Sequence, residues 1–534
     1  YLLQNKVEKA TQILIKATTA IPDQVEPRLN LGKFYVAAHK YDQAMDVYQQ
    51  TENDFPDDLR PVKGKARIYF DTGRIQQAEK TVEKLLSNKE GDLFAQVLKG
   101  RIQLSKKQFS EAVATFGKLV QDYPQEADVH YFMALSKLGQ GQERQGVAGL
   151  EKTLERNPEH RLANLLLGEI KLRDGDLDSA AKYCQTSLDV NPADIRGHLL
   201  QGRIALAEKD ISKAKKSFTT ITELSPDVSM GYLHLGQLYL LQKEFEKSLA
   251  QFKLALEKDP QSTQAIKNIA LVHLARQEPG KALSFCSRLL TNHASNEKLK
   301  SFILTTQASV YLQLNKTAKA KQAYQKAIKA NPDWTTPYLG LAGLYEKLEQ
   351  TEQAIAQYEE VHKKSQEFIP AMMSLAILYQ QNEQFEKAKA YYQKCLDIDD
   401  AFAPAANNLA YLLLETGGNV DQALSLAQSA KRIRPDDPGI SDTLGWIYVH
   451  KKAYASAIAQ LKDAVAKLPD NPSIQYHLGS AYYRNDNPQQ ARRHLQAALN
   501  TKWSFPERDK ATEVLRELEK LSELSKEEEI EGKS

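Results

Sequence analysis

Proline stands at residues 22, 56, 124, 158, 192, 226 and 260, so that every gap between neighbours is 34 residues or twice 34. A sequence that folds into ordinary globular domains has no reason to keep such a period. A fixed period of this length is typical of helical units that cannot bury their apolar face alone and therefore stack on their neighbours. The chain is predicted to be a repeat array whose function lies on an extended surface.

Small residues recur in the same frame when each proline is counted as position 32 of a repeat. Position 8 is Gly or Ala in all fourteen repeats, from Gly32 to Gly479, and position 20 is Ala, Gly or Ser in all fourteen, from Ala44 to Ala491. Position 11 is often Tyr, and position 24 is mostly aromatic or aliphatic. Small residues allow the two helices of a repeat to approach closely, and we expect the larger side chains to fill the gap to the next repeat. Proline ends the second helix because it cannot donate a backbone hydrogen bond.

This order of small, aromatic, small, aromatic and proline positions resembles the tetratricopeptide repeat, and the resemblance extends from residue 1 to about residue 505. It implies an all-α chain, a right-handed superhelical α-solenoid of about fourteen 34-residue helix-turn-helix repeats. In each repeat a helix A is followed by a helix B. The resemblance also implies a non-enzymatic scaffold that binds other proteins or peptide segments in the concave groove of the array.

The repeat register predicts the organisation of the chain. We expect a partial repeat at 1–24, in which Tyr1 already holds position 11, then repeats 1 to 8 at 25–300 and repeats 9 to 14 at 301–505. A four-residue insertion at 297–300 is expected to lengthen a loop, and one extra residue enters near Gly417 and Gly418. An apolar stripe predicts a capping helix at 506–524, and the acidic segment 525–534 predicts a disordered tail.

Composition argues against several functions. The net charge is +3 over 534 residues, so no global field favours nucleic acid as a partner. No apolar run approaches the roughly 18 residues of a membrane span. Cys184, Cys286 and Cys395 occupy core positions of helix B and are predicted to be buried, unreactive thiols. The histidines lack metal-ligand spacing and no catalytic motif falls in its required context, so the sequence predicts no catalytic residue, cofactor or metal.

On a helix wheel, positions 2, 5, 9 and 13 of helix A point toward the concave groove. In the first three repeats these positions carry five cations, which we name the basic groove: Lys33, Arg60, Lys63, Arg67 and Arg101. Such a wall would attract a carboxylate-rich peptide, a chain terminus or an anionic polysaccharide. The alternative is an ordinary solvated face that pairs with Asp71 and neighbouring acids.

The groove positions of the middle repeats are apolar. We name them the apolar groove: Tyr131, Leu135, Leu162, Leu165, Leu199, Leu233 and Leu271. If half of these side chains are exposed, an amphipathic helix, an apolar tail or a second copy of the chain should cover them. The alternative is that the solenoid buries them against its own helices.

The last repeats place aromatic and polar residues at the groove positions. We name them the aromatic groove: Asn407, Tyr411, Asp442, Trp446, His450, Tyr476, Tyr483 and Arg484. Aromatic side chains with a polar edge recur at binding hot spots. We expect Trp446 to bind a ligand without a packing role, because Gly445 beside it already serves the helix crossing. The alternative is that the whole group serves packing.

The run that begins Asn407-Asn-Leu-Ala-Tyr and ends Asp442-Thr-Leu-Gly-Trp446 is similar to the terminal repeats of large bacterial tetratricopeptide proteins. These include lipoproteins linked to exosortase and exopolysaccharide gene clusters. The similarity implies a bacterial source, a role in envelope or exopolysaccharide assembly, and a periplasmic or membrane-anchored location. Because the chain begins inside a helix, we expect membrane contact only through an anchor upstream of Tyr1.

A second interpretation is a direct polysaccharide-binding subunit of an export machinery. The two interpretations differ in the part of the groove that they use. An anionic glycan would occupy the basic groove and the aromatic groove, whereas protein partners would occupy the apolar groove.

Overall fold

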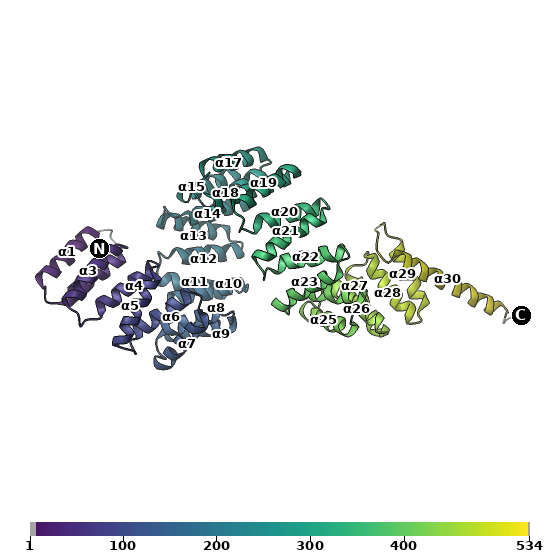
Figure 1. The fold of residues 1–534 in the computed structure, drawn as a ribbon, viewed down its shortest axis with the longest axis horizontal. Helices are drawn as coiled ribbons and strands as arrows, with labels where there is room; N and C mark the ends of the chain where they lie inside the picture. The colour runs from purple at the N-terminus through teal and green to yellow at the C-terminus, as the bar shows by residue number, and fades with distance from the viewer. Residues whose placement is uncertain (1–6, 503, 532–534) are drawn as a thin grey trace. The chain divides into compact units, whose positions relative to one another are not determined.

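A computed structural model describes residues 7–502 and 504–531 of the chain. In these ranges the chain forms α-helices joined by short turns, and no strand occurs there (Figure 1). The all-α repeat solenoid predicted from the sequence is therefore confirmed. The chain divides into two compact units, Tyr1–Ala265 and Ile266–Ser534, and the division falls inside α16. Tyr1, which the sequence places in the partial repeat, lies outside the described residues.

In the first unit, α1 is the helix B of the partial repeat. From α2 onward, each even-numbered helix is the helix A of a repeat and the odd-numbered helix after it is the helix B. The helices of this unit are α1 (Val7–Ala20), α2 (Val25–Ala37), α3 (Tyr41–Asp54), α4 (Arg60–Asp71), α5 (Ile75–Asn88), α6 (Leu93–Ser105), α7 (Phe109–Asp122), α8 (Ala127–Gly139), α9 (Glu143–Arg156), α10 (Arg161–Arg173), α11 (Leu177–Val190), α12 (Ile195–Ala207), α13 (Ile211–Leu224), α14 (Ser229–Leu241) and α15 (Phe245–Lys258), followed by α16 (Thr263–Ala275).

The second unit continues the same alternation and ends with an additional helix, α30. Its helices after α16 are α17 (Pro279–Asn292), α18 (Glu297–Gln313), α19 (Thr317–Ala330), α20 (Thr336–Lys347), α21 (Thr351–Lys364), α22 (Ile369–Gln381), α23 (Phe385–Ile398), α24 (Ala403–Glu415), α25 (Val420–Ile433), α26 (Pro438–His450), α27 (Tyr454–Lys467), α28 (Pro472–Arg484), α29 (Pro488–Leu499) and α30 (Arg508–Glu531).

The small residue at position 8 forms a socket for the ring at position 24. A Cβ atom added to Gly202 would lie 2.2 Å from Cε1 of Phe218, and one added to Gly100 would lie 2.4 Å from Cζ of Phe116. Both rings are completely buried. The sequence places these rings in the gap to the next repeat, but the structure packs them first against helix A of their own repeat. The absence of a side chain at position 8 therefore sets how closely the two helices approach.

The turn from helix A to helix B has the same backbone conformation in every repeat. One residue at position 15 has a positive φ, and it is glycine in four repeats, as at Gly73 and Gly175. The other ten repeats adopt the same left-handed conformation with a larger residue, such as His39 or Lys243. The turn geometry is thus imposed by the packing of the two helices, and glycine only makes it easier to adopt.

Proline ends helix B as the sequence predicts. The prolines at 56, 124, 158, 192, 226 and 260 each follow directly after the C-cap residue of a helix B. The extra residue near Gly417 lies in the turn between α24 and α25, where Gly417 takes the positive φ of that repeat.

One predicted loop and part of the predicted disordered tail are helical instead. Residues 297–300 form the first turn of α18, which has 17 residues where the other helices A have 12 or 13. The insertion therefore lengthens a helix rather than a loop. Likewise α30 runs from Arg508 to Glu531, beyond the predicted end of the capping helix at 524. It includes residues 525–531 of the predicted disordered tail, and residues 532–534 lie outside the described ranges.

Filling the socket at position 8 should destabilise the array. Gly202→Ala drives a Cβ atom into the Phe218 ring, and such overpacking costs about 1 to 3 kcal/mol. Gly343→Ala is the matched control, because Gly343 is an exposed glycine of α20 with no neighbouring atom within 4 Å of the added Cβ. Since alanine favours a helix by up to about 1 kcal/mol over glycine, we expect the control to melt at the same or a higher temperature. Equal melting temperatures for the two variants would contradict the socket.

Candidate partner-binding site

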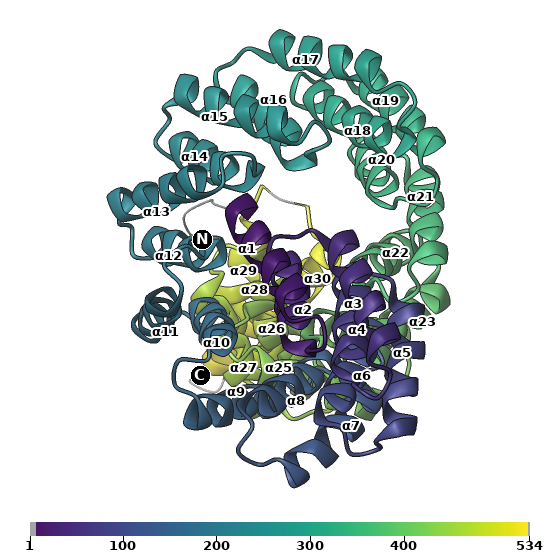
Figure 2. The ribbon, with the colours of Figure 1, turned by 90° about the vertical axis from the view of Figure 1, so that its left-hand side faces the viewer.

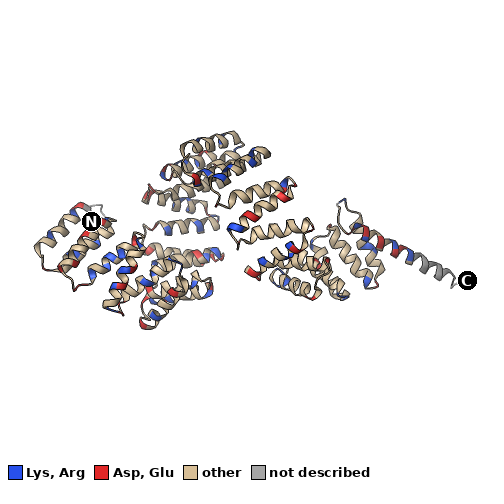
Figure 3. Cartoon of the chain, in the orientation of Figure 1, with Lys and Arg blue, Asp and Glu red and all other residues tan. Residues whose placement is uncertain are grey.

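The basic groove lies on the helices A of the first three repeats. Helix α2 contacts α4, and α4 contacts α6, so the groove faces of these helices form one wall (Figure 2). Lysine and arginine are spread over many helices of the chain, as Figure 3 shows. The basic groove is therefore distinguished by the placement of its cations rather than by their number.

A hollow of about 450 Å³ opens in this wall. Four of the five predicted cations line it, namely Lys33, Arg60, Lys63 and Arg67. The remaining lining is apolar or small: Leu29, Val36, Ala37, Tyr48, Gly64 and Phe94. The structure thus brings together most of a site that the sequence predicts from helix position alone. It adds an apolar floor that the sequence analysis does not include.

Two of the lining cations are engaged in holding adjacent repeats together. The Lys63 ammonium lies 2.5 Å from the carboxylate of Asp92, the N-cap residue of α6. Burial alone would raise the pKa of Asp92, but Lys63 and the Ala95 amide outweigh it and hold that pKa below its usual value. Arg60 donates to Asp58 and, through Nη1, to Glu26 of α2 at 2.7 Å. Because the donors of Lys63 and Arg60 already bond to acids of the chain, we assign these two side chains to the shape of the hollow rather than to ligand binding.

Lys33 and Arg67 keep unused donors in the same hollow. The Lys33 ammonium is 3.9 Å from Glu26, which is beyond hydrogen-bonding distance, and 64% of its side chain is exposed. Arg67 donates only from Nε, to Asp71 at 3.1 Å, and 54% of its side chain is exposed. Its two Nη groups make no hydrogen bond to any described residue. The predicted pairing with Asp71 is therefore present, but it leaves the outer edge of this guanidinium available.

Arg101 lies further along the same wall, outside the lining of the hollow. Its guanidinium sits 4.6 Å from the centroid of the Phe70 ring and 5.4 Å from that of Phe132. Within the described residues it makes no hydrogen bond and no ion pair. Burial, together with the charge of Arg67, lowers the pKa of Arg101, although a guanidinium stays protonated at neutral pH. Two aromatic rings thus hold a cation whose five N–H donors are unused.

The floor of the hollow depends on two glycines. The Tyr48 ring lies between Gly32 and Gly64, where added Cβ atoms would lie 2.4 Å and 2.6 Å from the ring. Burial raises the pKa of Tyr48 to about 12. The sequence does not indicate this role, because the residue type at the position of Gly64 varies from repeat to repeat.

The apolar groove is mostly covered by the chain itself. Tyr131 and Leu165 are buried, and Leu135, Leu162, Leu199 and Leu233 are half-buried. Tyr131 packs against His160, with ring centroids 4.9 Å apart. Leu271 alone among the seven is exposed, with 42% of its surface accessible. The condition for an exposed apolar patch, that half of the seven be exposed, is not met.

The aromatic groove is centred on a buried tryptophan, so the expectation that Trp446 has no packing role is wrong. Trp446 is only 8% exposed and belongs to the hydrophobic core of the second unit. Its ring stacks on His477 at 4.2 Å, and its Nε1 donates to Glu415 at 3.3 Å. Tyr476 is also buried, Tyr411 and Asn407 are half-buried, and His450 and Arg484 are exposed. Tyr483 donates its hydroxyl proton to Glu517 of α30.

His477, which the sequence analysis did not single out, is the buried ion-pair partner of Asp442. Its Nδ1 lies 2.8 Å from Oδ1 of Asp442, and its Nε2 is buried without a hydrogen-bond partner. Burial alone lowers the pKa of His477, but Asp442, Glu507 and Glu415 outweigh it and leave that pKa raised. The predicted site residue Asp442 therefore serves the packing of α26 against α28.

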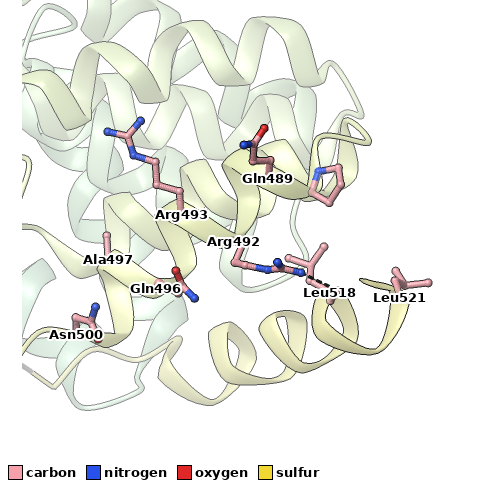
Figure 4. A pocket seen from close by; sticks show the side chains of 9 residues that line it. Gln489, Arg492, Arg493, Gln496, Ala497, Asn500, Leu518 and Leu521 are labelled. Atoms are coloured by element: carbon pink, nitrogen blue, oxygen red, sulfur yellow. Dashed lines mark hydrogen bonds between the residues drawn. The ribbon is translucent and has the colours of Figure 1, made fainter. Parts of the chain in front are cut away.

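A second hollow, of about 760 Å³, lies between α29 and α30 (Figure 4). It contains Arg492 and Arg493, with Leu518 and Leu521 from α30. Arg492 donates from Nη2 to the backbone oxygen of Leu518 at 3.2 Å, whereas Arg493 points away from it (Figure 4). Because this hydrogen bond from Arg492 joins α29 to the capping helix α30, we assign the hollow a structural role. The sequence gives no signal for it, since its shape depends on the angle at which α30 meets α29.

The cysteines match their prediction. Cys184, Cys286 and Cys395 are free and buried. Burial raises the pKa of the Cys184 and Cys286 thiols to about 12 and that of Cys395 to about 11. In the described residues, no group of three or more His, Cys, Asp or Glu side chains is arranged to hold a metal ion. None of the described helices has the length and apolar character that crossing a membrane requires.

Family models described as tetratricopeptide repeat match most of the chain. The matched residues are 1–68, 379–447 and 448–502 for one model, 63–127, 131–195 and 199–263 for a second, and 303–333 for a third. The chain belongs to the tetratricopeptide repeat family. No curated protein matches the sequence significantly.

Several solved structures are similar to the chain. A chain in the crystal structure of the APC/C hetero-tetramer Cut9-Hcn1 is 17% identical with a TM-score of 0.45, and the match covers 94% of this chain and 98% of that one. A tetratricopeptide repeat protein from Parabacteroides merdae is 17% identical with a TM-score of 0.36, over 48% and 99% of the two chains. YrrB, a protein described as having an unusual peptide-binding site, is 20% identical with a TM-score of 0.31, over 35% and 95%.

Trp446→Ala should destabilise the second unit by roughly 3 to 5 kcal/mol, the usual cost of truncating a core aromatic residue. Arg484→Ala, at an exposed position of α28, is the control and should change stability by less than about 0.5 kcal/mol. Melting followed by circular dichroism checks both variants. An unchanged melting temperature for Trp446→Ala would contradict the packing role and would favour Trp446 as a ligand-binding side chain.

The His477 and Asp442 pair predicts a pH dependence. Because the pKa of His477 is raised in the folded chain, its ion pair with Asp442 stabilises the fold fully at pH values below about 6.5, the ordinary pKa of an unfolded histidine. This stabilisation is lost as the pH rises through the pKa of His477 in the folded chain. The melting temperature of the wild type should therefore fall from about pH 6.5 upward. Asp442→Asn removes the partner charge, so its melting temperature should change less over the same range. Parallel profiles for the two proteins would contradict a charged His477.

Proposed function

We propose that the chain is a non-enzymatic interaction scaffold that binds an acidic segment of a partner protein in the basic groove. One observation supports this most strongly. Lys33, Arg67 and Arg101 present hydrogen-bond donors that no described residue uses, and they lie on one wall beside a hollow with an apolar floor. Charge-assisted hydrogen bonds to carboxylates are among the strongest that such donors form.

The existing ion pairs in the groove do not prevent binding. Exposed pairs such as Arg67 with Asp71 contribute about 0 to 1 kcal/mol, so a ligand carboxylate competes with little loss. A guanidinium also has enough donors to hold Asp71 through Nε and a second carboxylate through its Nη groups. The apolar floor adds burial for a ligand side chain that lies between the charges.

The other two grooves support a binding role less well. A protein partner in the apolar groove, or a second copy of the chain there, would need exposed side chains, and among its seven residues exposure is confined to Leu271. A polysaccharide in the aromatic groove would need free ring faces, and Trp446 and Tyr476 are buried. For these reasons we favour a peptide ligand over direct polysaccharide binding.

The cellular context that we propose is bacterial envelope or exopolysaccharide assembly, at a periplasmic or membrane-anchored location. The support for it is the similarity of residues 407–446 to lipoproteins linked to exosortase clusters. Fractionation of cells that express the full-length protein tests this part separately, and recovery in the cytoplasm alone would overturn it.

Selection from a random peptide library tests the binding function. We expect the wild type to enrich acidic peptides and the double variant Arg67→Glu and Arg101→Glu to lose that enrichment. The control is Lys118→Glu with Lys152→Glu, which makes the same charge change at exposed positions of two helices B, α7 and α9. Enrichment that is lost equally in both double variants would show a general charge effect and contradict the proposed site.

A further inference from the structure

The three cations with unused donors occupy the same place in successive repeats. Lys33, Arg67 and Arg101 all hold position 9, one residue after the position-8 socket, and each is 34 residues from the next. Their helices, α2, α4 and α6, contact one another in turn. Helices in such contact lie about 8 to 10 Å apart, so the cations form a row with a spacing of roughly 10 Å.

The shortest regular segment that matches this spacing on one face is a polyproline II helix, whereas an α-helix needs seven residues for each interval. A polyproline II helix has three residues per turn and rises about 3.1 Å per residue, so every third side chain lies on one face at intervals of roughly 9 Å. A β-strand fails, because its successive side chains alternate between faces and every third residue changes side. The row of cations therefore favours a ligand in the polyproline II conformation.

Resting on the proposed function, we infer that the partner of the basic groove is a segment in the polyproline II conformation with a carboxylate at every third residue. Lys33, Arg67 and Arg101 each bind one carboxylate. The row ends after Arg101, because position 9 of the fourth repeat is Leu135. Three cations correspond to a segment of about seven residues.

The surroundings of each cation agree with this assignment. Arg67 is held by Asp71 through Nε alone, which leaves its Nη groups available to a second carboxylate. Arg101 is held by the Phe70 and Phe132 rings, and neither Asp71 nor Asp128, the carboxylates whose charges act on it, bonds to it. Arg67 and Arg101 are thus held by contacts that leave donors unused, whereas the Lys33 ammonium is exposed and lies beyond hydrogen-bonding distance of Glu26.

The apolar floor identifies what lies between the acids. Leu29, Val36 and Ala37 line the hollow that Lys33 and Arg67 share. An aliphatic side chain or a proline of the ligand fits there, and proline also favours the polyproline II conformation before binding. The rings near the groove are less suited to sugar, because Lys63 lies 5.8 Å from the Phe94 ring centroid and Arg101 lies over Phe70 and Phe132. This arrangement favours a peptide over an anionic glycan.

Binding of synthetic peptides to the full chain, followed by fluorescence anisotropy, tests the inference. The first peptide is Glu-Pro-Ala-Glu-Pro-Ala-Glu, and the second has the same composition with its three glutamates adjacent. A third places glutamates seven residues apart on a helix-forming sequence, because a helix also rises roughly 10 Å over seven residues. We expect the first peptide to bind at least about 10-fold more tightly than the other two, which corresponds to one carboxylate contact of about 1.4 kcal/mol.

Variants of the protein assign this preference to the row. Lys33→Gln and Arg67→Gln each remove one cation at a position where more than half of the side chain is exposed, so both should fold. Each should reduce the preference for the first peptide, while Lys118→Gln should leave it unchanged. Circular dichroism confirms the fold of every variant.

The outcomes separate this inference from the proposed function. Equal affinity for the first two peptides, lost in both when Arg67 and Arg101 are reversed to Glu, would overturn the spacing and leave the acidic-segment function standing. Tighter binding of the helical peptide would replace the polyproline II ligand by a helix. Failure of all three peptides to bind would overturn both proposals. Both would also be overturned if polygalacturonate displaced the bound first peptide at a lower concentration of carboxylate groups than unlabelled first peptide requires.

Discussion

The contact between the small residue at position 8 and the side chain at position 24 is the constraint on which the rest of the structure depends. Where Phe218 fills the space left by Gly202, helix A and helix B cannot approach or separate without loss of packing. The same contact fixes the rotation of helix A about its axis. Position 9 follows one residue later, about 100° around the helix, so each socket also directs the neighbouring side chain toward the groove. The row of cations is thus a consequence of the packing.

The basic groove illustrates how one set of charges serves two roles. Lys63 and Arg60 bond to acids on neighbouring helices and so contribute to the stacking of repeats. Lys33, Arg67 and Arg101 are positioned by the same helices but retain unused donors. A single ion pair at the surface contributes little to stability. The hydrogen bonds that each cation makes therefore show better than the number of charges which cations join the repeats and which can bind a ligand. This distinction is available only from the structure.

The repeat frame predicts much of the fold, because it depends on contacts that recur at fixed spacing within a repeat. It correctly places the helices of the repeats, the proline boundaries and the buried cysteines, and it includes four of the cations that line the hollow. It fails where the outcome depends on neighbours outside the repeat. Trp446 holds a groove position on the helix wheel, yet His477 of the next helix A covers it. Helical propensity at residues 297–300, and the angle of α30, are likewise properties that a 34-residue pattern does not contain.

In the proposed complex, three position-9 cations form a row that binds carboxylates at a regular interval. A crystal structure of the full chain with a peptide that carries glutamate at every third residue tests this claim most directly. We expect the three carboxylates to contact Lys33, Arg67 and Arg101 in order along the peptide, with the Asp71 bond to Arg67 Nε retained. A peptide bound elsewhere, or bound in the groove with its glutamates directed to solvent, would contradict it.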